Sequence, residues 1–175
     1  PITSTLQGLG AYPGDHHQFL GMLGMHGTYE ANNAMHDCDL MINIGARFDD
    51  RITGKIDEFS PKSKKVHIDI DPSSIGKIVK VDLALVSDVE VFLSALIKKF
   101  KEKNKNFIDI NKGNIEKWWK QIDKWREKKS LSYKNSDTII KPQHAVERLY
   151  ELTKNQDTFI TPEVGQHQMW AAQYY

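Results

Sequence analysis

Apolar runs closed by glycine, proline or acidic residues recur along the chain and predict short strands. The clearest is Leu40–Ile44, which stops at Gly45 and is followed by two arginines and two aspartates. Apolar runs of this length between turn residues are typical of buried strands in a parallel sheet. We expect strands at Pro1–Leu6, Leu40–Ile44, Lys65–Asp71, Leu83–Val86 and Asp157–Thr161.

Apolar side chains at helical spacing predict helices between and after these strands. The most regular helix begins after Asp88, where the apolar residues from Val89 to Phe100 fall on one face. Further helices are expected at Tyr29–Asp37 after a Thr28 cap, from an Asn114 cap, from Pro142 and after Gly165. The segment from Gly8 to Gly27 is expected to be a glycine-rich loop, and the polar segment Lys101–Gly113 a linker or loop.

Strands joined by helical crossovers indicate an α/β fold, a doubly wound, Rossmann-like parallel sheet with helices on both faces. At 175 residues the chain is short for two complete α/β domains, so we expect part of a longer protein that continues into a second α/β domain. The expected division is a central domain at 1–104, a connecting segment with an amphipathic helix at 105–141, and the beginning of a further domain at 142–175.

Composition narrows the classes of partner. Lysine and arginine total 24 against 23 acidic residues, a net charge of +1, which argues against nucleic acid as a partner. The single Cys38 excludes an internal disulfide framework and suits a reducing compartment, where we expect a buried, inert thiol. No long apolar span or signal segment is present, so we expect a cytoplasmic protein that does not enter a membrane.

The residues that follow Gly45 carry the chemistry of a ligand-binding edge. Open α/β sheets bind ligands at the carboxyl ends of their strands. Gly45 allows close approach of a backbone to a ligand, and Arg47 and Arg51 are forked donors suited to phosphate. Asp49 and Asp50 could accept from hydroxyls or orient the arginines. The alternative is a solvated cluster of ion pairs in a loop.

Acidic residues also end the next two predicted strands. Asp69 stands where dinucleotide-binding folds place the partner of ribose hydroxyls, although the Asp71-Pro72 sequence would start a turn without any ligand. Asp88 is a good helix N-cap, and we favour this capping interpretation over a role in ligand binding.

Three further motifs each have a structural explanation. The residues of the Met22–Gly27 loop could line a site for a flat ring, or they could simply pack in a core. His16, His17 and His26 lack the spacing of a zinc site, so no metal ligand is assigned in this chain. The tryptophans at 118, 119 and 125 lie on a helical stripe, which favours packing over base stacking.

Four motifs in order, GMLGMHGTYEAN, GARFDDR, VHIDIDP and EVGQHQMWAAQ, resemble the large catalytic subunit of acetohydroxyacid synthase, also called acetolactate synthase, in its bacterial form. The resemblance covers nearly the whole chain, as an internal fragment. It implies an enzyme of branched-chain amino acid biosynthesis that depends on thiamine diphosphate, decarboxylates pyruvate and condenses the product with pyruvate or 2-ketobutyrate. It also implies FAD in a structural role in the central domain.

The same resemblance implies binding residues, position by position. The flavin contacts would be Thr5, Leu6, Leu23, Gly24, Met25, His26, Gly45, Ala46, Arg47, Phe48, Asp49, Asp69, Ile70, Asp88 and Val89. Asp50 and Arg51 would lie near the channel for substrate or inhibitors. Val164, Gly165, Gln166 and His167 would approach the diphosphate of thiamine diphosphate, although Pro162 departs from the small hydroxyl residue that the family more often has there. No catalytic residue is expected in this chain.

The resemblance further implies groups that lie outside this sequence. These are the glutamate that assists activation of the thiamine ring and the ligands of the magnesium ion, so this chain alone would be inactive. The implied partners are 2-ketoacids, a second large subunit in a homodimer, and a regulatory small subunit. Two alternatives stay open: another thiamine-diphosphate enzyme that carries FAD, such as glyoxylate carboligase, and a nucleotide-binding module without catalysis.

Overall fold

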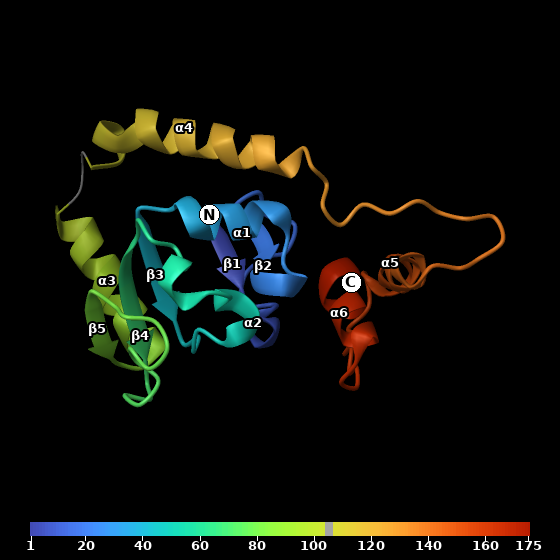
Figure 1. The fold of residues 1–175 in the computed structure, drawn as a ribbon, viewed down its shortest axis with the longest axis horizontal. Helices are drawn as coiled ribbons and strands as arrows, with labels where there is room; N and C mark the ends of the chain where they lie inside the picture. Colours follow the sequence, from blue (N-terminus) through green and yellow to red (C-terminus); the bar gives the residue numbers. More distant parts are fainter. Residues whose placement is uncertain (104–106) are drawn as a thin grey trace. The chain divides into compact units, whose positions relative to one another are not determined.

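The computed structural model describes residues 1–103 and 107–175 (Figure 1). The chain divides into two compact units by its internal contacts. One unit is formed by Pro1–Thr28 together with Lys129–Tyr175, and the other by Tyr29–Lys128.

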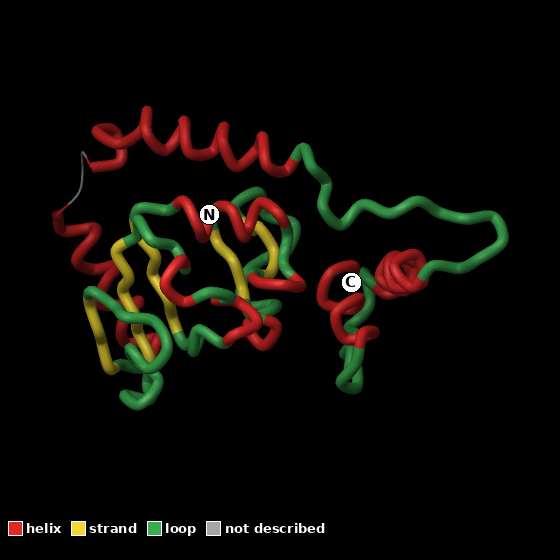
Figure 2. The backbone as a smooth tube through the Cα atoms, viewed as in Figure 1, coloured by secondary structure: helices red, strands yellow, loops and turns green. Residues whose placement is uncertain are grey.

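The unit Tyr29–Lys128 is built on a three-stranded parallel sheet. Its strands are β3 (Leu40–Ile44), β4 (Lys64–Asp69) and β5 (Leu83–Val86), in the order β3-β4-β5 (Figure 1). Its helices are α1 (Tyr29–Asp37), α2 (Asp50–Thr53), the 3₁₀-helix η3 (Ile56–Glu58), α3 (Val89–Lys103) and α4 (Phe107–Arg126). Figure 2 shows how helices and strands alternate along the chain. Parallel strands linked through helices confirm the predicted α/β, Rossmann-like class.

A hydrophobic cluster of this unit lies on one face of the sheet. Phe48, Phe59 and Val79 are buried together, and Met41 of β3 packs against them. Alternate residues of β3 point the other way, as the period of a strand requires, and Leu40, Ile42 and Ile44 keep 38–51% of their surface exposed. The prediction of a fully buried strand at Leu40–Ile44 is therefore wrong for the described chain, in which one face of β3 is covered.

A buried polar network ties the start of β4 to the end of α1. The Ser60 hydroxyl donates to the Met35 carbonyl at 2.6 Å, and the Lys65 Nζ donates to the carbonyl oxygens of Ser60 (2.8 Å) and Ser63 (3.2 Å). Cys38 is a free thiol of intermediate exposure whose Sγ donates to the Met35 carbonyl at 3.2 Å. The donors named here each have an acceptor, so burying them costs little free energy.

The segment predicted to be a linker is largely helical. α3 continues through Lys101–Lys103 and α4 begins at Phe107, so the prediction of a loop at Lys101–Gly113 is wrong on both sides of residues 104–106, which lie outside the described residues. Asn114 lies inside α4 and does not cap it. Ile108, Ile115 and Ile122 share one helical stripe in the sequence, a period that the polar composition concealed.

α4 packs against α1 along its apolar stripe. Ile122 is completely buried, and the rings of Trp118 and Trp125 meet edge to face with centroids 5.6 Å apart. Arg126 lies over the Trp119 ring at 5.8 Å. These contacts confirm that the tryptophans serve packing. No helix of the described residues combines the length and the apolar character that crossing a membrane would need.

The other unit contains a strand that the sequence did not reveal. β1 (Ile2–Ser4) pairs in parallel with β2 (Phe19–Met22), within the segment predicted to be a loop. Gly21 interrupts the apolar run and adopts φ +87°, which hid the strand from a periodicity argument. Thr28 is held against β2, because its hydroxyl donates to the Leu20 carbonyl at 2.5 Å.

α5 (Pro142–Thr153) and α6 (Gln166–Tyr174) pack together and complete this unit. Tyr133 donates to the Glu147 carboxylate, which raises the pKa of Tyr133 to about 12, and its ring meets Tyr174 edge to face. The predicted strand at Asp157–Thr161 is wrong for the described residues, in which this segment belongs to no strand.

Candidate cofactor-binding site

The carboxyl end of β3 is open backbone. Gly45 follows the strand with φ +67°, and its N–H donates to the Ile68 carbonyl at 2.8 Å. Among the described residues other than Gly45 and its two chain neighbours, no heavy atom lies within 4 Å of the position that a Cβ would occupy there. A flat or phosphorylated ligand could therefore approach the backbone at Gly45 without meeting a side chain.

The turn after Gly45 is stabilised by contacts on its core side. Asn43 of β3 donates its Nδ2 proton to the Ala46 carbonyl at 2.5 Å. Phe48 adopts φ +58° and buries its ring against Phe59 and His67, with centroid distances of 5.7 and 5.2 Å. The side chain of Phe48 belongs to the core, so a flavin could meet only its backbone.

The four charged residues of the turn form two exposed ion pairs. Arg47 lies 3.3 Å from Asp49, and Arg51 lies 3.8 Å from Asp50, with each side chain more than half exposed. Pairs of this kind contribute little to stability. The solvated ion-pair cluster weighed above is thus present, and both guanidinium groups remain accessible to a ligand at this edge.

Asp69 ends β4 beside this turn. Its side chain is 8% exposed, and its Oδ1 accepts from the Asp71 N–H at 2.9 Å. Asp71 itself accepts from the N–H and the hydroxyl of Ser73, and these hydrogen bonds hold the pKa of its carboxyl below the usual range. The turn predicted at Asp71-Pro72 is therefore confirmed. Ile70 is 71% exposed at the same strand end.

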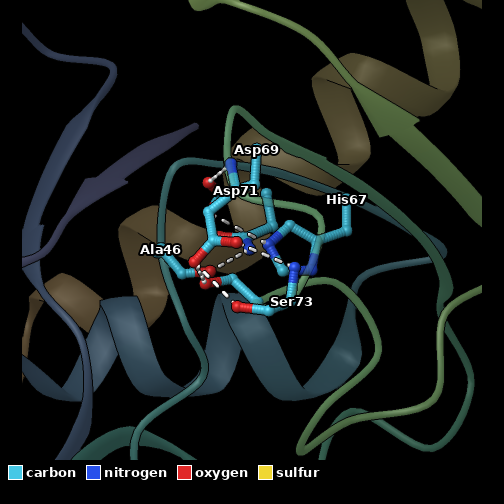
Figure 3. Close-up of polar contacts among 7 residues, drawn as sticks. Ala46, His67, Asp69, Asp71 and Ser73 are labelled. Atoms are coloured by element: carbon cyan, nitrogen blue, oxygen red, sulfur yellow. Dashed lines mark hydrogen bonds and ion pairs between the residues drawn. The ribbon is translucent and has the colours of Figure 1, made fainter.

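His67 lies on the core side of β4 and was not singled out from the sequence. Figure 3 shows it close to Ala46 and Asp69, and its Nε2 is 3.8 Å from the Asp69 Oδ2. Burial lowers the pKa of His67, against the opposing effects of the Asp69 carboxylate and the Ala46 carbonyl. The imidazole is consequently neutral at pH 7. A histidine at an inward position of an alternating strand was the signal that could have identified it.

Asp88 caps α3. Its Oδ1 accepts from the N–H of Glu90 at 2.8 Å and from that of Val91 at 3.4 Å, so the capping interpretation is confirmed. Val89, the next residue, is 46% exposed. A flavin contact by either residue stays a prediction.

The remaining predicted flavin contacts belong to the unit that contains β1 and β2. Thr5 caps the 3₁₀-helix η1 (Leu6–Gly8) by accepting from the Gly8 N–H at 3.2 Å. Leu23 precedes the 3₁₀-helix η2 (Gly24–His26), in which Met25 is 67% exposed. A side chain at Gly27 would overlap the Met22 carbonyl, which explains the glycine there.

A recess of about 190 Å³ lies in this same unit. Leu20, His26, Thr28, Leu131 and Gln173 are among its lining residues, and the Gln173 Nε2 donates to the His26 carbonyl at 2.9 Å across it. Typical ligand pockets measure about 300–1,000 Å³. The recess is therefore too small to enclose a dinucleotide.

The predicted diphosphate segment leads into a helix. Gly165 directly precedes α6, and a Cβ there would stand 2.8 Å from the His167 ring. Val164 is 84% exposed, so the approach to the first turn of α6 is open on that side. The free N–H groups of a helix start suit a phosphate.

The histidines near the start of the chain are engaged locally. The Tyr12 hydroxyl lies 3.0 Å from the His16 Nδ1 and donates to the Gln18 Oε1 at 2.9 Å. Within residues 1–103 and 107–175, no three histidine, cysteine, aspartate or glutamate side chains are grouped as metal ligands would be.

The chain is similar to known proteins over most of its length. Residues 1–96 match the model of the thiamine pyrophosphate enzyme central domain. The chain is 46% identical over its whole length to an acetolactate synthase large subunit of Haemophilus influenzae, and 44% identical to the isozyme 3 large subunit of Escherichia coli; it covers 30% of each. It is also 44% identical over 99% of its length to an acetolactate synthase of Mycobacterium leprae, of which it covers 27%.

Proposed function

Because this chain belongs to the thiamine pyrophosphate enzyme family, through that family's central domain, we propose that it is part of an acetolactate synthase large subunit. The observation that carries the proposal is the extent of the similarity, which runs through all 175 residues and so includes both candidate cofactor segments. The chain spans 27–30% of the length of these relatives, and the remaining machinery would lie in the rest of the protein.

The proposed reaction starts from pyruvate. One pyruvate loses carbon dioxide, and its two-carbon remainder joins a second pyruvate or 2-ketobutyrate on the path to the branched-chain amino acids. When bound, thiamine diphosphate supplies the carbanion chemistry that this decarboxylation needs. The assignment of magnesium, a homodimer and a regulatory small subunit to the whole enzyme belongs to the same proposal.

We propose that the main role of this chain is to bind FAD in a structural capacity. Gly45 leaves space for a ring or phosphate, the Arg47 guanidinium is exposed beside it, and among the described residues the Asp71 N–H donates to the Oδ1 of Asp69 and leaves its Oδ2 for a ribose hydroxyl. These features support a nucleotide at the β3-β4 edge. Residues 5, 6, 23–26, 88 and 89 would add contacts.

The segment Val164–His167 would hold the diphosphate of thiamine diphosphate. Its support is the open approach to the first turn of α6, where backbone N–H groups can donate to phosphate oxygens. The chain carries no candidate for the magnesium ligands or the activating glutamate, so we propose that it is inactive alone. Asp50 and Arg51 would line the access channel.

The test uses the full-length protein. Purified apoprotein is titrated with FAD, FMN and NAD, and acetolactate formation from pyruvate is then measured with thiamine diphosphate and magnesium added. We expect saturable binding that prefers FAD, and acetolactate as product. Preference for NAD would overturn the flavin assignment, turnover of glyoxylate in place of pyruvate would indicate glyoxylate carboligase, and binding without any turnover would favour a non-catalytic module.

A further inference from the structure

His67 is a buried polar group that no role described above requires. Its side chain has no exposed surface, and within the described residues neither ring nitrogen makes a hydrogen bond of ordinary geometry, although the Ala46 carbonyl lies near enough to act on the ring. Leaving both nitrogens unpaired in the interior costs free energy that an apolar side chain of similar size would not. A residue retained at such a cost calls for an explanation from its surroundings.

Several neighbours of His67 belong to the candidate flavin edge. Asn43 is its partner across the β3-β4 register and donates to the Ala46 carbonyl, which also lies near the imidazole. The Phe48 ring stands perpendicular to the imidazole at 5.2 Å, and the Asp69 Oδ2 lies 3.8 Å from Nε2. The imidazole therefore contacts both the turn after Gly45 and the acid that ends β4.

We propose that His67 is a positioning residue for the flavin site, which fixes the turn 45–49 and the Asp69 carboxylate for the adenosine half of FAD without touching the cofactor. The inference rests on the proposed function, because it gives a task to a residue beside the site that the proposal assigns to FAD. Asn43 acts with it, by holding the Ala46 carbonyl from the neighbouring strand.

The distances explain how His67 could orient Asp69 and leave it free to bind. The Asp69 Oδ1 is taken by the Asp71 N–H, so Oδ2 is the oxygen left for a ribose hydroxyl. At 3.8 Å, Nε2 is beyond the ordinary hydrogen-bond range of about 2.7–3.2 Å, so in the tautomer that carries the proton on Nε2 the ring attracts Oδ2 without occupying it. Edge-to-face packing of the His67 ring against Phe48 stabilises the turn 45–49 from its core side.

The competing explanation is that His67 only fills space in the core. His67→Leu separates the two, because leucine fills much of the volume and removes the unpaired nitrogens. If His67 positions the site, the apoprotein of this variant is as stable as wild type or more stable, while its dissociation constant for FAD rises about tenfold. His67→Gln, which restores an N–H, should recover most of that loss.

Ile68→Ala supplies the matched control, since Ile68 is the adjacent buried residue of β4 and faces away from the turn. It should lower the stability of the apoprotein and change the FAD dissociation constant by less than about threefold. FMN lacks the adenosine half, so the preference of the His67→Leu protein for FAD over FMN should fall, a change that core filling alone does not produce.

The titrations are made on the full-length protein, beginning with wild type. Failure of wild type to bind FAD would overturn the proposed function together with this inference. Wild-type binding with an unchanged FAD dissociation constant in His67→Leu would overturn the inference alone. A loss of FAD affinity that follows the loss of stability equally in His67→Leu and Ile68→Ala would also overturn it.

Discussion

Replacing Gly45 by alanine tests whether a ligand really approaches the end of β3. In the free protein the new methyl group would enter open space, so its cost is conformational: alanine at φ +67° is strained by about 1–2 kcal/mol. Alanine also restricts the unfolded chain, which returns about 0.4–1 kcal/mol. The net loss of stability should therefore lie between about 0 and 1.6 kcal/mol.

The bound state is different if the proposal is right. A methyl group wedged between the backbone and a flavin should cost about 1–3 kcal/mol as overpacking, which raises the dissociation constant about 5-fold to 150-fold. Flavin fluorescence titration of the full-length Gly45→Ala protein measures this value, and urea unfolding of the apoprotein measures the stability.

Gly76→Ala is the matched control, because Gly76 has φ +68° and equally open space around a Cβ. Both variants should lose similar stability, and only Gly45→Ala should lose affinity for FAD. Equal FAD affinity in Gly45→Ala, Gly76→Ala and wild type would refute the assignment of the flavin to this strand end.

Three other expectations concern charge, packing and pH. Arg47→Ala should weaken FAD binding several-fold more than Lys55→Ala, a comparison made by fluorescence titration, and equal effects would remove the ligand role of Arg47. Ile122→Ala should lower the free energy of unfolding by about 2–4 kcal/mol in urea, whereas exposed Lys120→Ala on the same helix should change it by less than about 0.5 kcal/mol; similar losses would show that α4 is not packed through Ile122. Because the pKa of His67 is lowered in the folded state, the unfolded chain binds the extra proton first, so stability should be complete above pH 6.5 and decline below it, by at most about 1.4 kcal/mol per pH unit. Urea unfolding of wild type and His67→Leu across that range measures this, and identical pH profiles would contradict it.

Local patterns in the sequence predicted correctly those helices, strands and turns whose type depends on residues close together in the chain. β3, β4, β5 and the start of α3 follow from apolar runs and from Asp88 as a cap, and the Asp71 turn follows from its own side chain. β2 was missed because Gly21 breaks its pattern, although pairing with β1 stabilises it. The strand expected at Asp157–Thr161 shows that a short apolar run does not by itself define a strand.

The candidate site shows the same division. Gly45 and Asp69 could be chosen from the sequence because their positions at strand ends define their chemistry. For His67 the sequence offers only its inward position on an alternating strand, and its relation to Asn43 comes from the β3-β4 register, which places the two opposite each other beside the turn. The inward fold of Phe48 likewise depends on a left-handed backbone that its residue type disfavours.

The unit that contains β1 and β2 draws on residues 1–28 and 129–175, and this imposes an order on the chain as it leaves the ribosome. β1 and β2 are made before α6, and Gln173, which donates to the His26 carbonyl, lies 147 residues after His26. At about 5–20 residues per second, that interval is about 7–30 s. Throughout it the glycine-rich segment lacks its contact with α6, so this unit stays incomplete while the intervening residues are synthesised.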